Sequence, residues 1–216
     1  MAETYTVKQG DYLSRIADEH GFTDYRTIWN HPKNDSLKQK RQNPNVLYPG
    51  DQVYIPDKET KEESRPTDQH HKFQVDRQKL RLQLVLEDLY EKPIANTQCE
   101  LTIDQETHKL TTGGDGKIQV DIPAKASQGF LTIRGSETPF ADEVIPIKIG
   151  HLDPVEEVSG QQARLTNLGY FAGDIDGQPG DDFESAVEEF QCDQGLKVDG
   201  VCGPVTQAKL KQVHGC

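Results

Sequence analysis

The segment from Pro56 to Lys72 limits what this chain can fold into more than any other feature. It reads PDKETKEESRPTDQHHK, with charged residues throughout, two prolines and no apolar periodicity. Such a composition is typical of a linker, because it offers no face that a hydrophobic core can bury. A single domain that runs through all 216 residues is therefore not expected.

The composition also favours several small domains. Hydrophobic residues make up 33% of the chain and the mean hydropathy is −0.76, and small domains bury less of their chain than large ones. A second change, from alternating to helical apolar patterns, falls near Gly150. The sequence predicts a multidomain α+β protein with four parts: an N-terminal unit (1–57), a linker (58–72), a β-sandwich (73–150) and a three-helix unit (151–216).

The charge restricts the class of partner. Lys and Arg number 24 against 36 Asp and Glu, which gives a net charge of −12. Nucleic acids and anionic membranes repel such a chain, whereas a neutral or mixed-charge glycan-peptide polymer does not. No apolar run approaches the roughly 20 residues that span a bilayer. We expect no nucleic-acid partner and no membrane insertion.

The residues from Met1 to Tyr5 lack the basic and apolar regions of a secretory signal. Removal of a signal, another export route and an internal location are the alternatives. We expect a place in the bacterial cell wall or periplasm after export, with a cytoplasmic stage until a non-classical secretion system delivers the protein.

The cysteines do not predict a metal site. None of the four belongs to a CxxC or CxxH pattern, so a zinc site of the usual spacing is not expected. A disulfide near the C-terminus and reduced thiols are both open alternatives. The four residues are Cys99, Cys192, Cys202 and Cys216.

The N-terminal unit is predicted to have the order β-α-α-β. Residues 4–7 form a β-prone run, Asp11 is a candidate helix N-cap, and apolar residues then recur at helical spacing up to Gly21. A second short helix contains Trp29, which we expect in the core. Residues 53–55 form the closing strand.

Two motifs of this unit resemble the LysM family. They are Tyr5-x-Val7-x-x-Gly10-Asp11-x-Leu13-x-x-Ile16-Ala17 and Leu47-x-x-Gly50-Asp51-x-Val53-x-Ile55-Pro56. LysM domains bind polymers of N-acetylglucosamine, chiefly peptidoglycan and chitin, in a shallow groove between the loop after the first strand and the loop before the second. Backbone amides and apolar faces suit acetamido sugars. The resemblance implies these ligand-binding residues: Gly10, Asp11, Tyr12, Leu47, Tyr48 and Pro49.

The segment 31–45 departs from the LysM family, which crosses this region in fewer residues. It carries four basic side chains in an otherwise acidic chain. Because it lies beside the expected groove, it is predicted to extend the groove, to block it, to contact a protein, or to be a solvated loop or short helix.

The central unit alternates apolar and polar residues, as half-buried strands do. Turn residues separate the strands, and Gly113 to Gly116 predicts a hairpin between residues 108–112 and 117–122. Short strands with Gly-rich turns favour an antiparallel β-sandwich. The pattern resembles transthyretin-like or carboxypeptidase-regulatory-like sandwiches, which implies a spacer or partner-contact role.

The C-terminal unit shows three helical patterns separated by Asp-Gly loops. Asp153 and Pro154 predict the start of the first helix, and Pro204 that of the third. The glycines of the two Asp-Gly turns are expected at positive φ. Each loop has too few spaced carboxylates for a calcium-binding EF-hand.

The motifs of this unit resemble the three-helix peptidoglycan-binding domain of many wall hydrolases. They are Leu165-x-x-Leu168-Gly169-Tyr170-x-x-Gly173-x-x-Asp176-Gly177-x-x-Gly180 and Ala186-Val187-x-x-Phe190-Gln191-x-x-x-Gly195-Leu196-x-x-Asp199-Gly200-x-x-Gly203-Pro204. The resemblance leaves the exact ligand site open. Our candidates surround the first interhelical loop: Tyr170, Phe171, Asp176 and Gln191.

No catalytic motif is complete. The ending His214-Gly215-Cys216 is similar to the core of the L,D-transpeptidase motif, but Val213 replaces its Ser and the large catalytic domain is missing. A cysteine nucleophile also needs an orienting scaffold. HExxH and GxSxG are absent. We therefore expect no enzyme activity, no catalytic residue, no metal and no cofactor.

Three functions follow as hypotheses. The first is a non-catalytic peptidoglycan-binding protein that anchors or targets a partner at the wall. The second is an accessory, adaptor or cargo-linked subunit of a contractile injection (type VI-like) secretion system, with a secreted toxin or spike protein as partner. It rests on a resemblance of the Asn43–Asp51 segment to proteins encoded beside such machines. The third is a wall hydrolase.

Overall fold

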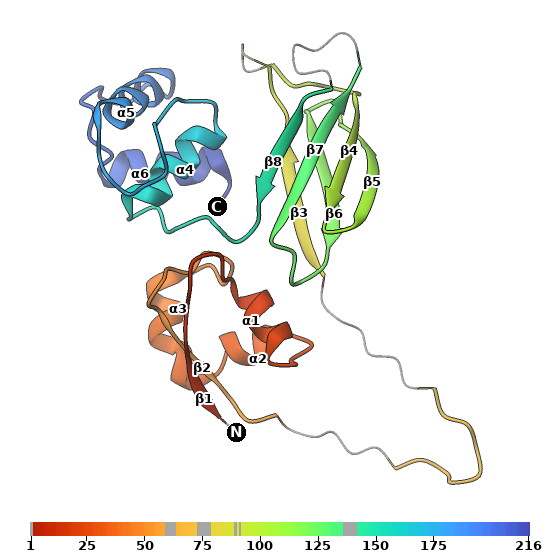
Figure 1. The fold of residues 1–216 in the computed structure, drawn as a ribbon. Coiled ribbons are helices and arrows are strands. Elements are labelled where there is room, and N and C mark those ends of the chain that lie inside the picture. Colours follow the sequence, from red (N-terminus) through yellow and green to blue (C-terminus); the bar gives the residue numbers. More distant parts are fainter. Residues whose placement is uncertain (1, 59–63, 73–78, 89, 91, 136–141) are drawn as a thin grey trace.

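A computed structural model describes residues 2–58, 64–72, 79–88, 90, 92–135 and 142–216. The described residues form an N-terminal βααβ unit, a β-sandwich and a helical unit, and residues 64–72 extend away from all three (Figure 1). The predicted mixed α+β fold class is confirmed.

The N-terminal unit has the predicted β-α-α-β order. Strand β1 (Glu3–Thr6) pairs antiparallel with β2 (Gln52–Ile55), and helices α1 (Leu13–Glu19) and α2 (Arg26–Trp29) lie between them in the chain. The core includes Leu13, Ile16, Ile28 and Val53, each 0% exposed. Trp29 is buried in this core, which confirms its prediction.

The inserted segment forms structure of its own. A 3₁₀ turn, η1 (Pro32–Asn34), leads into helix α3 (Asp35–Arg41). The buried Asn34 amide donates to the carbonyl oxygens of Ile28 and Tyr54 at 2.8 Å, and its Oδ1 accepts from the Tyr54 N–H at 2.8 Å. The insertion is therefore packed against β2 and is not a solvated loop.

A buried ion pair fixes the end of α3. The Arg41 side chain donates from Nε to Asp51 Oδ2 at 2.6 Å and from Nη2 to Oδ1 at 2.9 Å. Their side chains are 5% and 4% exposed. Lys40 also donates to Asp51 at 3.2 Å. Two of the four basic residues of the insertion therefore hold the fold.

Two predicted helix caps are wrong. Tyr12, not Asp11, precedes α1, and Asp11 instead accepts from the Tyr5 hydroxyl and the Lys8 N–H, both at 2.8 Å. Helix α4 (Val158–Asn167) begins later than Asp153, which accepts from the Ser159 hydroxyl at 2.7 Å. The Asp11 carboxylate thus stabilises a turn before α1, an alternative that Asp side chains offer the backbone, whereas the Asp153 carboxylate binds the first turn of α4 through a side chain.

The central unit is an antiparallel sandwich of two sheets. One pairs β3 (Leu80–Val85) with β6 (Lys117–Ile122). The other has the order β5-β4-β7-β8, and its buried positions alternate along β4, where Cys99, Leu101 and Ile103 face the core. Its strands are β4 (Gln98–Ile103), β5 (Glu106–Thr111), β7 (Gln128–Arg134) and β8 (Val144–Lys148).

The predicted hairpin at residues 113–116 is wrong. β5 pairs with β4 and β6 pairs with β3, so this turn passes from one sheet to the other. The reason is packing, since each sheet buries its apolar face only against the other sheet. Gly116 is needed here, because its φ is +73° and an added Cβ would lie 2.4 Å from the Leu86 carbonyl oxygen.

The C-terminal unit has the three predicted helices. After α4 come α5 (Asp181–Asp193) and α6 (Pro204–His214), with Pro204 at the first position. Val187, Phe190 and Leu210 are 0% exposed at their centre. Gly177 and Gly200 have φ of +77° and +67°, as predicted for the Asp-Gly turns.

All four cysteines are free thiols. The alternative of a disulfide near the C-terminus is not found, and the reduced-thiol alternative describes the structure. Cys99 is buried in the sandwich core, and this burial raises the pKa of its thiol.

Replacing Arg41 with Ala is expected to destabilise the N-terminal unit by about 3 kcal/mol, because it removes the two-bond partner of the buried Asp51 carboxylate and leaves the exposed Lys40 as its remaining cation. Urea unfolding monitored by fluorescence of Trp29, the single tryptophan, measures this. Arg26→Ala is the control, since Arg26 pairs with Asp24 at the surface and exposed pairs contribute little. Equal losses in the two variants would contradict the prediction.

Acid is expected to weaken the same unit. Burial opposes ionisation of Asp51, but hydrogen bonds from Arg41, the Tyr48 N–H and Lys40 outweigh it and hold its pKa below 3.8. A carboxyl group whose pKa is lower in the folded state than in the unfolded state stabilises the fold at pH values above its unfolded-state pKa. This stability is lost as the pH falls through its folded-state pKa. Trp29 fluorescence followed from pH 7 to pH 2 should show this loss below about pH 4, and Asp51→Asn should flatten it.

Candidate functional site

The fold brings the two predicted LysM loops together. The Val7 N–H donates to the Asp51 carbonyl oxygen at 2.9 Å, and the Gly50 N–H donates to the Val7 carbonyl oxygen at 2.9 Å. The Leu13 N–H also reaches the Pro44 carbonyl oxygen at 3.1 Å. The loop after β1 and the loop before β2 are therefore neighbours, as the groove hypothesis requires.

Several of the predicted ligand residues have structural contacts instead. Gly10 turns the chain at a φ of +87°. The Asp11 contacts with Tyr5 and Lys8 hold this turn, and burial together with the Asp11 carboxylate raises the pKa of Tyr5 to about 12. Leu47 is 4% exposed in the N-terminal core.

The remaining three predicted LysM residues differ in exposure. Tyr48 and Pro49 are half-buried, and the Arg41 guanidinium lies 5.6 Å from the centre of the Tyr48 ring. Tyr12 is only 1% exposed, and its ring packs with the core of the sandwich. Tyr48 and Pro49 are thus the members of this set that keep accessible surface.

Each Asp-Gly loop of the C-terminal unit is fastened by a buried glutamine of the preceding helix. Gln162 on α4 donates to Asp176 Oδ1 at 3.1 Å and accepts from the Gly177 N–H at 2.9 Å. Gln191 on α5 does the same at the second loop, with Asp199 Oδ1 at 3.0 Å and the Gly200 N–H at 3.1 Å. The two loops are therefore built alike and rigidly held.

The glutamine contacts define the roles of two predicted site residues. Gln191 is 1% exposed, and its amide also donates to the Val201 carbonyl oxygen and the Thr206 hydroxyl. Asp176 is exposed, and hydrogen bonds from the Gln178 N–H and Gln162 lower its pKa. Gln191 holds the loop from beneath, and Asp176 presents a carboxylate at the surface.

The two aromatic candidates lie side by side in the chain but differ in exposure. Tyr170 is half-buried, stacks edge-on against Phe190 at 5.7 Å and donates from its hydroxyl to Asp193 at 3.0 Å. Phe171 is 73% exposed. Further exposed apolar side chains, which sequence reasoning missed, lie on the two loops and the first turn of α6: Ile175, Val198, Val201 and Val205.

The pair His214–Cys216 does not have the properties of an activated nucleophile. Cys216 Sγ lies 3.2 Å from His214 Nδ1. Burial and the nearby Arg164 lower the pKa of His214 to about 4, and burial raises that of the Cys216 thiol. Both groups are neutral at pH 7, whereas a reactive cysteine is a thiolate.

The described residues show neither a candidate metal cluster nor a candidate membrane span. Within the described ranges, no three His, Cys, Asp or Glu side chains lie close enough to hold a metal ion. No helix among the described residues has the length and apolar character needed to cross a membrane.

Family models identify both end units. The LysM domain model matches residues 5–38, and the PG_binding_1 model, which describes a peptidoglycan binding domain, matches residues 155–210. The chain therefore carries two domains of the peptidoglycan-binding class. The N-terminal one is a LysM domain and the C-terminal one is a PG_binding_1 domain.

Curated relatives match only part of this chain. N-acetylmuramoyl-L-alanine amidase CwlM of Mycobacterium tuberculosis is 40% identical over 55 residues, which are 26% of this chain and 14% of the relative. A spore cortex-lytic enzyme of Halalkalibacterium halodurans is 34% identical over 94 residues, 42% of this chain and 27% of the relative. No solved structure matches the chain.

Replacing Gln191 with Ala is expected to loosen the second Asp-Gly loop, because it leaves the Asp199 and Gly200 N–H groups without their acceptor. The expected cost is about 1–3 kcal/mol of unfolding free energy, with faster hydrogen exchange at these two amides. Gln212→Ala, at an exposed position of α6, is the matched control. Unchanged exchange in Gln191→Ala would show that the loop does not depend on this side chain.

Proposed function

We propose that this protein binds peptidoglycan without cleaving it and holds a partner at the bacterial cell wall. The exposed Phe171 beside a rigid loop carries this proposal. Phe171 is 73% exposed and Ile175 of the same loop is 53% exposed, and grouped apolar side chains in solvent commonly mark interaction sites. The flat apolar face of the Phe171 ring fits the apolar face of a sugar ring.

The surroundings of Phe171 support a glycan-peptide ligand. The Asp176 carboxylate and the backbone of the first loop supply polar partners, while Ile175 adds apolar surface. Ligand sites commonly combine apolar walls with a few fixed polar groups. Because Gln162 holds this loop, binding would require little ordering of the backbone.

Two binding domains on one chain strengthen attachment to a polymer. When one module is bound, the second is held near the same polymer, so its binding becomes intramolecular. The central sandwich then serves as spacer or as the contact for a partner. The sequence resemblance suggests a class of partner for it. This partner is a secreted toxin or a spike protein of a contractile injection system.

A wall hydrolase is the second candidate function, and the names of the relatives favour it. They are an amidase and a spore cortex-lytic enzyme, but this chain spans only 14% and 27% of their lengths. Incubation of the protein with purified peptidoglycan, followed by chromatography of the soluble fraction, tests for cleavage. Released muropeptides would replace our proposal with this candidate.

Co-sedimentation with purified sacculi tests the binding proposal. The full chain should pellet with sacculi, and Phe171→Ser should reduce the bound fraction several-fold because it removes the exposed ring. Val85→Ser is the matched control, since Val85 is 50% exposed on the sandwich, away from both binding domains. A wild-type protein that stays wholly in the supernatant would refute the proposed function.

A pull-down experiment tests separately whether the protein binds a toxin or spike component. The intact protein, immobilised, should retain a co-expressed toxin or spike component if the injection-system alternative is correct. Retention that does not depend on Phe171 would assign the contact to another surface. Failure to retain either component would remove the alternative and leave wall binding unaffected.

A further inference from the structure

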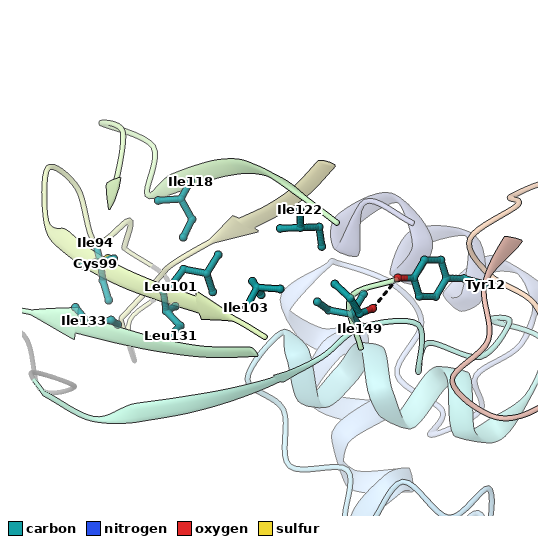
Figure 2. Close-up of a cluster of buried hydrophobic side chains, with 11 residues drawn as sticks. Tyr12, Ile94, Cys99, Leu101, Ile103, Ile118, Ile122, Leu131, Ile133 and Ile149 are labelled. Atoms are coloured by element: carbon teal, nitrogen blue, oxygen red, sulfur yellow. Dashed lines mark hydrogen bonds between the residues drawn. The ribbon is translucent and has the colours of Figure 1, made fainter. Parts of the chain in front are cut away.

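The ring of Tyr12 lies outside its own domain core. Tyr12 directly precedes α1 in the LysM domain, yet it packs with Ile149 in the hydrophobic cluster of the sandwich. Its hydroxyl donates to the Ala126 carbonyl oxygen at 2.6 Å, a contact drawn as a dashed line in Figure 2. Burial raises the pKa of Tyr12, so the hydroxyl stays a donor.

The chain that leaves β8 crosses the same loop. An added Cβ at Gly150 would lie 2.4 Å from Tyr12 Cδ1 and 2.7 Å from the Gly10 carbonyl oxygen. An added Cβ at Gly10 would lie 3.1 Å from the His151 ring. The Gln9 amide donates to the Asp153 carboxylate at 3.3 Å. Gln9 to Tyr12, the first loop of the predicted groove, is therefore in contact with residues 150–153.

We propose that residues 150–153 and the adjoining end of the sandwich occupy the sugar-binding loop of the LysM domain, and that a glycan reaches this loop only after the domain separates from them. The inference rests on the proposed function, because it assumes that the loop of Gly10 to Tyr12 binds N-acetylglucosamine. The closed arrangement is then an internal competitor of the ligand.

The chain length permits such separation. Residues 56–79 connect β2 to β3, and 24 residues can span up to roughly 80 Å when extended. The LysM domain can thus leave the sandwich without pulling on it. The same tether keeps the domain at a high local concentration, which favours reclosure. The apparent glycan affinity falls by the fraction of molecules that are open.

A ligand of the LysM loop must displace the contacts of this interface. The interface includes one buried tyrosine ring, the hydrogen bonds of Tyr12 and Gln9, and the close fit of two glycines. The inserted helix end adds to it, because Lys40 to Asn43 line a pocket together with Pro154 and Glu156. Gly10 and Gly150 have φ of +87° and +79°, so both the contact and the backbone favour glycine. Polymer with many sugar repeats, or a partner on the sandwich, can shift such an equilibrium.

Gly150→Val in the full chain tests the proposal without changing any LysM residue. The new side chain would collide with the Tyr12 ring, so the domain should detach and the radius of gyration from small-angle scattering should rise. Binding of the N-acetylglucosamine tetramer, titrated by calorimetry, should become at least tenfold tighter than in the wild type. Gly135→Val is the matched control, because Gly135 shares the positive φ and no described residue lies within 4 Å of an added Cβ there.

Tyr12→Phe is a second, milder variant that keeps the ring. Loss of one net hydrogen bond should favour the open form and raise tetramer affinity about two- to tenfold. Wild-type affinity equal to that of both variants would overturn the proposal, and so would an unchanged radius of gyration in both. Tetramer binding by none of the three proteins would overturn it as well.

Sacculus pelleting of the same variants separates this proposal from the proposed function. Pelleting without any tetramer binding would overturn the masking of the LysM loop and leave wall binding through the C-terminal domain intact. Tighter tetramer binding by Gly150→Val without pelleting of any variant would support the masking and refute the proposed function.

Discussion

The contact between Tyr12 and the end of the sandwich is the interaction on which the arrangement of this protein depends. The LysM unit, the sandwich and the helical unit each have an apolar cluster of their own. Tyr12 is the residue of the first unit whose ring joins the core of the second. Its hydrogen bond to Ala126 satisfies a polar group that burial would otherwise leave unpaired. This contact thus places the N-terminal unit against one end of the sandwich.

Within each small unit, buried polar side chains hold loops and helix ends in place through hydrogen bonds. Arg41 and Asp51 join the inserted helix to the loop before β2, and Gln162 and Gln191 fasten the two Asp-Gly loops. Arg164, 1% exposed, donates to the carbonyl oxygens of Asp153, Gly160 and Cys216, and burial lowers its pKa. Small domains have little apolar core, so satisfied polar groups decide the conformation of their loops.

Function in this chain depends on which surfaces the structure leaves open. The C-terminal domain exposes Phe171 and several apolar side chains beside rigid loops, whereas the LysM domain has its first loop against its own chain. If both proposals hold, the C-terminal domain makes first contact with the wall and the LysM domain adds its binding after opening. With this sequence of binding steps, both domains would attach only where the local density of peptidoglycan is high enough.

The sequence by itself determined the local elements and both domain families, because apolar periodicity, helix-ending glycines and paired motifs are local properties. Gly177 and Gly200 have the positive φ that the Asp-Gly turns required. The sequence-based prediction was wrong at the Gly113 turn, where sheet packing overrides hairpin chemistry. It was also wrong at Asp11 and Asp153, neither of which is the N-cap of the helix that follows. Only the tertiary structure decided that Tyr12 lies against the sandwich and that Phe171 stays in solvent. Both are aromatic residues next to Gly-containing loops, and their burial depends on neighbours distant in the chain.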